Sequence, residues 1–317
     1  MEVAAALRPV VGIDDAFGVR AEALRSLQRR LAELFADAGY QEVIPPIVER
    51  PESLACGAGR FLAEQTIVFS DPADAGQLAL RPDITPQIAR LAATRLRQQS
   101  ELRLHYSGPV VLARAGEGGE GRQQWQTGIE LFGIGGIEAE IEVLQLAGRA
   151  MVQAGFDAPL LRIGHIGLLQ SLLGEDADLA YWVALLRRRS PEDLHRALDG
   201  AGVAADAAAL LTAMVRDGGD LELLRDHAGI NDAFGRAVDL LDTLRRRLEE
   251  VLGGCCRVEV DGLLTPRFLY HSGTIFCGYA EGHSRVLLHG GRYDAMMAAH
   301  GRDLPAIGFS CDLWRWI

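Results

Sequence analysis

Gln126 and Glu130 carry side chains that could recognise a polar small molecule. Successive side chains of an extended strand point to opposite sides, so a strand here would place both side chains, with Gly128, on one face. The other face would carry a larger set, namely Trp125, Thr127, Ile129 and Leu131. An amide and a carboxylate on one face are unusual in a core, because buried polar groups need hydrogen-bond partners. The pattern is compatible with a catalytic site, a binding site or the remnant of one.

Two further segments carry candidate polar residues. The stretch RPDITPQIARLA, beginning at Arg81, has the pattern of a turn entering a helix. We predict Thr85 as its N-cap and Pro86 as its first helical residue, because a threonine hydroxyl can accept an early N–H and proline needs no N–H there. His271 lies between Tyr270 and Ser272 on a glycine-containing strand. A ligand contact and an ordinary core position are equally compatible with this histidine.

Other chemical motifs do not occur in the sequence. The five cysteines have no CxxC spacing and the eight histidines no HxxxH or HxH, so no metal site is predicted. GGRYDAM at 290–296 lacks the P-loop pattern, and GIGG at 133–136 is not the dinucleotide fingerprint. Three glutamates lie where a helix begins and where the helix dipole favours acidic groups, namely Glu138, Glu140 and Glu142. The sequence therefore indicates no metal and no cofactor.

Charge and composition exclude several classes of protein. The formal net charge of −11 argues against a nucleic-acid backbone as principal partner, because such binding uses clustered basic side chains. No apolar run approaches the roughly 20 residues that span a bilayer, and the first residues do not form a signal peptide. An odd number of cysteines without a signal peptide favours reduced thiols. We therefore expect a cytoplasmic protein with no membrane and no nucleic-acid partner.

The elements that must position these residues are read from hydrophobic periodicity. The order is helix, several strands, helices, then strands, and it lacks regular βαβ alternation, which favours an α+β fold with an antiparallel sheet. Helices are predicted at 18–40 and 137–155, and strands at 104–133 (two, around a glycine-rich loop), 257–262, 268–280 and 284–291. The segment 167–256 is almost entirely helical in pattern. We predict it as a helical insertion into a core formed by residues 1–166 and 257–317.

Five blocks, in order along the chain, resemble the class II catalytic core of the histidyl-tRNA synthetase family. They are LRPDITPQIARLA, YSGPVVLAR…EGRQQWQTGIELFG, FLYHSGTIFCGY, HGGRYDAM and PAIGFSCDLWRW. AGYQEVIPPIVE matches the first class II motif, with Pro46 at the place of the motif proline, and the second and third motifs match 104–133 and the end of the sequence. The resemblance implies a class II aminoacyl-tRNA synthetase-like antiparallel sheet flanked by helices, a helical insertion, and a homodimer built through the first motif.

The groups that serve adenylation in this family are altered here. Counting through the ungapped second motif, Leu112 stands at the place of the arginine that clamps the ATP α-phosphate, and Arg114 at that of the following glutamate. Trp314 replaces the glutamate of the third motif. Leu269 stands at the aspartate place of the family's arginine loop, and Arg267 lies one position off the catalytic arginine. Because one such electrostatic group is worth on the order of 10²–10³ in rate, we expect little adenylation.

The residues that form the amino-acid pocket in this family are better preserved here than those that serve adenylation. By resemblance, the candidate histidine-binding residues are Asp83, Thr85, Gln126, Glu130, Tyr270 and His271. Asp83 and Thr85 would hold the ammonium group, and Glu130 would accept the imidazole N–H. His271 replaces a tyrosine of the recognition loop. The alternative is that these polar groups are inherited and satisfied by waters or by neighbours such as Arg114.

One family accounts for all these changes, the synthetase-like regulatory subunits of ATP phosphoribosyltransferase. The sequence shows no anticodon-binding domain after the third motif, so we expect little hold on tRNA. The resemblance implies a non-catalytic partner of a short-form catalytic subunit, assembled as a hetero-octamer and transmitting feedback inhibition by L-histidine. Two alternatives stay open: a divergent histidyl-tRNA synthetase-like amino-acid-activating enzyme, and a scaffold with an inactive pocket.

Overall fold

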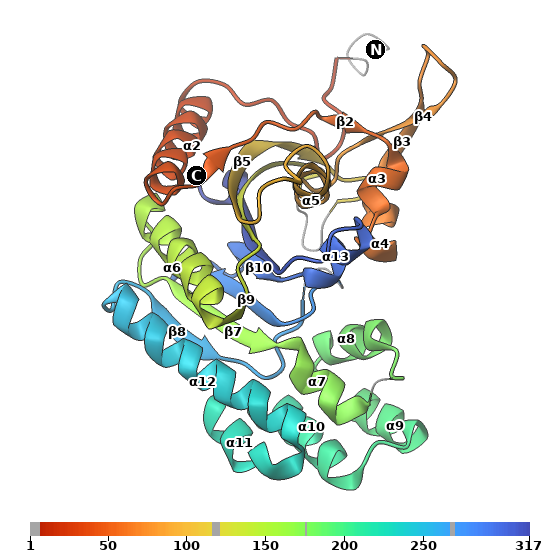
Figure 1. Ribbon diagram of the computed structural model, residues 1–317, viewed down its shortest axis with the longest axis vertical. Helices are drawn as coiled ribbons and strands as arrows, with labels where there is room; N and C mark the ends of the chain where they lie inside the picture. The colour runs from red at the N-terminus through yellow and green to blue at the C-terminus, as the bar shows by residue number, and fades with distance from the viewer. Residues whose placement is uncertain (1–6, 116–120, 175, 267–269) are drawn as a thin grey trace. The chain divides into compact units, whose positions relative to one another are not determined.

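The computed structural model describes residues 7–115, 121–174, 176–266 and 270–317 (Figure 1). The chain forms two compact units. Unit 1 consists of Met1–Gly133, Met296–Leu304 and Ser310–Ile317, and unit 2 of Ile134–Ala295 and Pro305–Phe309. Two elements have residues in both units, namely α13 (Asp294–Ala299) and β11 (Ala306–Asp312).

Unit 1 is built on a long antiparallel hairpin. Its strands are β5 (Leu102–Val111) and β6 (Gln123–Phe132), and β1 (Gln41–Glu42) runs parallel to β5 at the edge. A second, antiparallel sheet has the order β2-β4-β3, from Val48–Glu49, Gln77–Leu80 and Ile67–Ser70. The helices of this unit are α2 (Val19–Asp37), α3 (Pro51–Ala55), α4 (Gly59–Gln65), α5 (Thr85–Ala93) and the 3₁₀ turn η2 (Leu313–Arg315).

Helices α2 and α5 cover opposite faces of the β5–β6 hairpin. The predicted apolar stripe of α2 is buried, and the Phe35 ring lies 5.8 Å from the His105 ring on β5. Gly39, with φ of +85°, follows the helix where a C-terminal stop was predicted. On the other face, the backbone N–H of Ile84 at the start of α5 bonds to Gln126 of β6. Polar side chains on that face of β6 therefore lie against the beginning of α5.

Unit 2 combines a four-stranded arrangement with most of the helices. Its strand order is β10-β9-β7-β8, from Leu288–Arg292, Thr274–Tyr279, Leu160–His165 and Arg257–Val260. Its helices are α6 (Gly136–Ala154), α7 (Ile166–Leu173), α8 (Leu179–Arg187), α9 (Pro191–Ala201), α10 (Ala205–Asp217), α11 (Leu221–Asp226), η1 (Ala228–Ile230) and α12 (Asp232–Leu252). Figure 1 shows α6 and α12 together beside these strands. Gly148 of α6 permits this close packing, since an added Cβ would lie 2.9 Å from Leu252 Cδ2.

The predicted α+β class is confirmed. The strand pairs are mainly antiparallel, with parallel pairs at β1–β5 and β7–β8. Between 166 and 252, every secondary-structure element among the described residues is a helix. The division into a core of 1–166 and 257–317 and an insertion of 167–256 stays a prediction. Within the described part of the chain, no helix is long and apolar enough to cross a membrane.

Candidate functional site

Four of the six candidate recognition residues come together in unit 1. The antiparallel register sets Gln126 opposite Gly108 and Glu130 opposite Leu104, so the alternation predicted for β6 places both polar side chains on the face toward α5. Both are buried, Glu130 with 1% of its surface exposed. The remaining two, Asp83 and Thr85, arrive from the turn that begins α5.

The role predicted for Thr85 as N-cap was wrong by one residue. The N-cap is Ile84, no side chain caps the helix, and Thr85 is already helical. Pro86, predicted as the first helical residue, is accordingly the second. The physical reason is that the Thr85 hydroxyl donates to Glu130 Oε1 at 2.8 Å, so it is not directed to the backbone. Thr85 therefore connects α5 to the buried carboxylate of β6.

Asp83 and Gln126 form one half of a hydrogen-bond network. Asp83 Oδ1 accepts Gln126 Nε2–H at 2.7 Å and the Thr85 backbone N–H at 3.1 Å. Gln126 Oε1 in turn accepts the Ile84 N–H at 2.8 Å, and Gln126 Nε2 also donates to Ser310 Oγ at 3.1 Å. These bonds determine the amide orientation of Gln126, because its oxygen faces a donor and its nitrogen faces acceptors.

Glu130 forms the other half of the network through hydroxyl groups. Its Oε1 accepts Thr85 Oγ1–H and also the Tyr106 hydroxyl, at 3.1 Å. Tyr106 is fully buried and stands opposite Gly128 in the β5–β6 register. Arg114, considered as an alternative partner for the acids, is an exposed residue beyond the end of β5.

A buried arginine supplies positive charge beside the network. Arg81 has 4% of its surface exposed and donates to the carbonyl oxygens of Pro109 (2.9 Å) and Pro45 (2.8 Å). Burial lowers its pKa to about 10, while the charges of Tyr106 and Asp83 act in the opposite direction. Arg81 therefore stays protonated near neutral pH, and one guanidinium accompanies the two buried carboxyl groups of Asp83 and Glu130.

The position predicted to correspond to the family's phosphate-clamping arginine is apolar and buried. Leu112, directly after β5, is 7% exposed. Its backbone N–H donates to the Arg122 carbonyl at 2.7 Å, and its own carbonyl accepts Arg122 Nε–H at 3.1 Å. An aliphatic side chain cannot make charge-assisted bonds to a phosphate. This position therefore has a packing role in unit 1.

Trp314 likewise has a packing role in unit 1. The Arg20 guanidinium lies 4.8 Å from the centre of its ring, a cation–π contact. Asp312 Oδ1 accepts the backbone N–H groups of Trp314 (3.2 Å) and Trp125 (3.0 Å), which ties η2 to β6. The surviving Arg315 lies 3.8 Å from Asp312 Oδ2. Arg267 and Leu269, the other positions predicted to be altered, lie outside the described residues.

Tyr270 and His271 belong to unit 2. Each has 9% of its surface exposed, and their ring centroids are 4.8 Å apart. Tyr270 also makes an edge contact with Tyr293 at 6.0 Å. Gly291 of β10 leaves room for the His271 ring, with which an added Cβ would collide. The structure thus brings these two residues together on one unit, and the other four on unit 1.

The sequence did not indicate several residues that bond to the buried polar groups. The network includes Tyr106 and Ser310, and Arg81 lies beside it. No local pattern in the sequence predicts these roles for a tyrosine, a serine and an arginine. Glu140 was interpreted as an acid favoured by a helix dipole, and that interpretation is incomplete. It is 3% exposed, pairs with Arg292 at 3.2 Å and accepts the Thr274 hydroxyl at 3.0 Å. Among the described residues, no group of three or more His, Cys, Asp or Glu could hold a metal ion.

The chain is similar to two related groups of proteins. A family model described as "Histidyl-tRNA synthetase" matches residues 12–315. A Burkholderia mallei protein named "ATP phosphoribosyltransferase regulatory subunit" is 35% identical over 306 residues, covering 95% of this chain and 79% of that protein. A protein of the same name from Alkalilimnicola ehrlichii is 33% identical over 315 residues, covering 95% and 77%. The solved structure of an "ATP phosphoribosyltransferase regulatory subunit/histidyl-tRNA synthetase" from Bacillus halodurans has a TM-score of 0.86 at 24% identity, covering 98% and 82%.

Proposed function

Because the chain belongs to the histidyl-tRNA synthetase-like family of ATP phosphoribosyltransferase regulatory subunits, we propose that it is the non-catalytic regulatory subunit of that enzyme. It would support the condensation of ATP with phosphoribosyl pyrophosphate on a short-form catalytic subunit, the first step of histidine biosynthesis. All five cysteines are free thiols, which agrees with the cytoplasm as its location.

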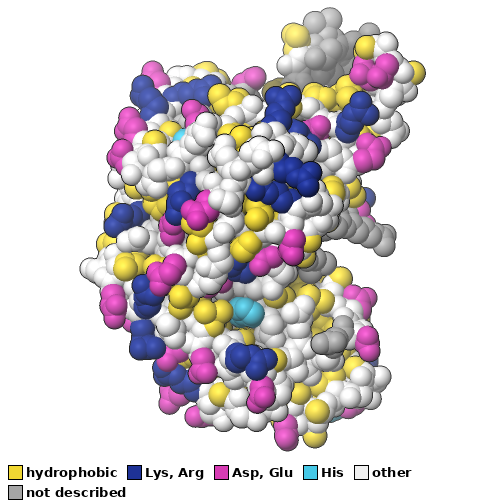
Figure 2. All heavy atoms as spheres, in the orientation of Figure 1, with side chains coloured by type: hydrophobic (Ala, Val, Ile, Leu, Met, Phe, Trp, Pro, Cys, Tyr) yellow, Lys and Arg dark blue, Asp and Glu magenta, His cyan; other side chains and the backbone are white. Residues whose placement is uncertain are grey.

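The observation that carries the non-catalytic role is the closed, apolar environment of Leu112. Adenylation needs preorganised positive groups around the transferring phosphate. Here the residue at that place is a buried leucine, and its backbone is bonded on both sides to Arg122. The face shown in Figure 2 carries basic and acidic side chains among one another rather than one extended basic surface.

L-Histidine is the proposed effector. It would bind at the two buried acids of unit 1, Asp83 and Glu130, which we call the carboxylate wall. Asp83 and Glu130 are both buried on this wall, and a carboxylate can pair with the cationic group of a ligand. The histidine ammonium would pair with Asp83, and the imidazole N–H would bond to Glu130. Tyr270 and His271, on unit 2, stay candidate histidine-recognition residues.

Reconstitution with a short-form catalytic subunit tests the proposal. Phosphoribosyl transfer is measured at increasing histidine for the wild type, Glu130→Gln and the control Glu138→Gln, an acid on α6 in unit 2 that pairs with Arg247. We expect Glu130→Gln to weaken inhibition by roughly tenfold or more, the loss of a charge-assisted hydrogen bond, and the control to be inhibited like the wild type. Unchanged inhibition of Glu130→Gln would place the effector site elsewhere.

Two assays on the isolated chain separate the alternatives. Histidine-dependent ATP–pyrophosphate exchange at synthetase-like rates would contradict the non-catalytic role and favour the divergent amino-acid-activating enzyme. Absence of histidine binding by calorimetry, together with intact activation of the catalytic subunit, would leave a scaffold with an inactive pocket.

The proposed assembly is a homodimer core within a hetero-octamer. Unit 1 exposes large apolar side chains in the first motif and just before α2, including Ile44 (84% exposed) and Phe17 (82%). Contiguous exposed apolar patches mark interaction surfaces. We propose that the homodimer buries them.

A further inference from the structure

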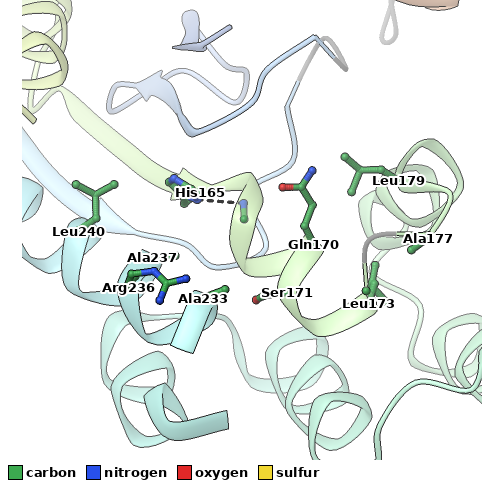
Figure 3. Close-up of a pocket in the computed structure, with 12 residues that line it drawn as sticks. His165, Gln170, Ser171, Leu173, Ala177, Leu179, Ala233, Arg236, Ala237 and Leu240 are labelled. Atoms are coloured by element: carbon green, nitrogen blue, oxygen red, sulfur yellow. Dashed lines mark hydrogen bonds between the residues drawn. The ribbon is translucent and has the colours of Figure 1, made fainter. Parts of the chain in front are cut away.

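Unit 2 contains a pocket of about 570 Å³ between α7 and α12. Such a volume lies within the range of small-molecule sites. Figure 3 shows Gln170 and Ser171 of α7 on one side of it and Arg236 of α12 on the other. The apolar part of the wall comes from leucine and alanine side chains, among them Leu173, Leu179 and Leu240. The lining therefore combines an apolar body with a few polar groups, as ligand sites do.

His165 presents a neutral N–H donor at this pocket. Its Nδ1 accepts the Gly167 backbone N–H at 3.0 Å, so the proton of the neutral ring is on Nε2. Burial lowers the pKa of His165 to about 4, with Arg292 acting in the same direction, so the ring is neutral at physiological pH. Gly167 is needed here, because an added Cβ would lie 2.8 Å from His165 Nδ1.

Arg236 differs from the other arginines of α12. Arg245 pairs with Glu249 at 2.8 Å, Arg246 lies 3.8 Å from Asp242, and Arg247 pairs with Glu138. Among the described residues Arg236 has no carboxylate partner, and no Asp or Glu lines the pocket. The described lining thus carries one positive charge with no compensating negative charge.

We propose that the pocket between α7 and α12 binds a small organic acid with one carboxylate and no amino group. The carboxylate pairs with Arg236, an oxygen of the ligand accepts His165 Nε2–H, and an aliphatic body packs on Leu173, Leu179 and Leu240. A single guanidinium suits a carboxylate better than a polyphosphate. An α-ammonium group finds no carboxylate on the described wall, so free amino acids, including the proposed effector, are disfavoured.

Calorimetry on the full chain with 4-methyl-2-oxopentanoate tests this pocket. The matched ligands are leucine, which has the same skeleton with an ammonium group, and 4-methylpentanamide, which has no charge. We expect saturable binding of the oxo acid, and at least tenfold weaker binding of the other two. The oxo acid should also bind at least tenfold more weakly to Arg236→Gln, and like the wild type to Arg246→Gln.

A second variant keeps the test independent of Arg236. Ala233 is an exposed residue of the pocket rim, so Ala233→Trp fills the opening without a change in the core. It should block the oxo acid while its far-ultraviolet circular dichroism matches the wild type. The proposal is overturned by no saturable binding in the millimolar range, by leucine binding as tightly as the oxo acid, or by wild-type affinity in both Arg236→Gln and Ala233→Trp.

Discussion

At the scale of single residues, Thr85 bonds to both acids of the carboxylate wall. The Thr85 hydroxyl donates to Glu130, and the Thr85 backbone N–H donates to Asp83. Both acids are 1% exposed, and a buried carboxylate is stable only with hydrogen-bond donors. One residue at the first turn of α5 therefore supports both acids of the proposed histidine site.

Thr85→Val tests this support. The methyl group keeps the volume but removes the donor to Glu130, so we expect the free energy of unfolding to fall by about 1–3 kcal/mol. Thr94→Val is the control: Thr94 is exposed and its hydroxyl bonds only the preceding turn, so a loss below about 0.5 kcal/mol is expected. Urea unfolding measures both. Equal losses would mean that Glu130 does not depend on Thr85.

His165 should make stability depend on pH. Its pKa is about 4 in the folded chain and about 6.5 when unfolded, so above roughly pH 6.5 both states are neutral. As the pH falls from about 6.5 to 4, the unfolded state binds a proton that the folded state does not, and stability is lost. The loss should approach about 3 kcal/mol at pH 4 and then level off.

The comparison variant for this prediction is His165→Asn. Asparagine keeps the capping acceptor for α7 but does not titrate. The difference in unfolding free energy between wild type and variant should therefore shrink as the pH falls from 7 to 4. A difference independent of pH would contradict a lowered pKa. The pKa of His105 is also lowered by burial, but His105 is present in both proteins and its effect cancels.

At the scale of elements, the β5–β6 hairpin determines on which face Gln126 and Glu130 lie. Its ten-residue strands pair from Leu102 to Val111, and a shift by one residue would turn Gln126 and Glu130 to the α2 face. Directly after β6, the backbone at Gly133 lies close to the backbone at Ser100. Gly133 has φ of +84°, and an added Cβ would collide with the Ser100 carbonyl oxygen. Position 133 therefore requires a residue without a Cβ atom.

Gly133→Ala should destabilise the chain by more than about 2 kcal/mol, since it combines a left-handed backbone with a clash against backbone atoms. Gly200→Ala in α9 is the matched control. Nothing lies within 4 Å of its added Cβ, and alanine favours a helix, so a gain of about 0.5 kcal/mol is expected. Thermal unfolding distinguishes the two. If Gly133→Ala left the stability unchanged, the backbone around Ser100 and Gly133 would be able to move apart at little cost in free energy.

At the scale of the whole molecule, exposed apolar side chains point to assembly. Ile44 follows β1 in the first motif, and Phe17 precedes α2; both are more than four-fifths exposed in the chain by itself. Scattered exposed apolar residues are ordinary, so the link to assembly comes from the position of Ile44 in the first motif. We therefore relate these residues to the proposed homodimer.

Ile44→Glu should weaken self-association by tenfold or more, because a charge would be buried in the subunit interface. Tyr181→Glu is the control: Tyr181 is 52% exposed on α8 of unit 2, outside the first motif. Sedimentation velocity at several concentrations measures the dissociation constants. Identical constants for Ile44→Glu and wild type would exclude the first motif as the dimer interface.

The sequence by itself determined the features that depend on local pattern. Alternation with period two predicted that Gln126 and Glu130 share a face, and the period of α2 predicted its buried stripe, since both follow from backbone geometry alone. Five ordered blocks identified the family, and counting through the second motif predicted a leucine, Leu112, at the place of the family's phosphate-clamping arginine.

Only the tertiary structure decided which donors the buried acids use. Glu130 bonds to Thr85 and Tyr106, 45 and 24 residues away in sequence, and Glu140 bonds to Arg292, 152 residues away. Pairings over such separations follow from how helices and strands pack, and no local propensity encodes them. For the same reason the Thr85 cap was predicted wrongly: a hydroxyl that can bond either the backbone or a distant carboxylate takes the partner that burial would otherwise leave unsatisfied.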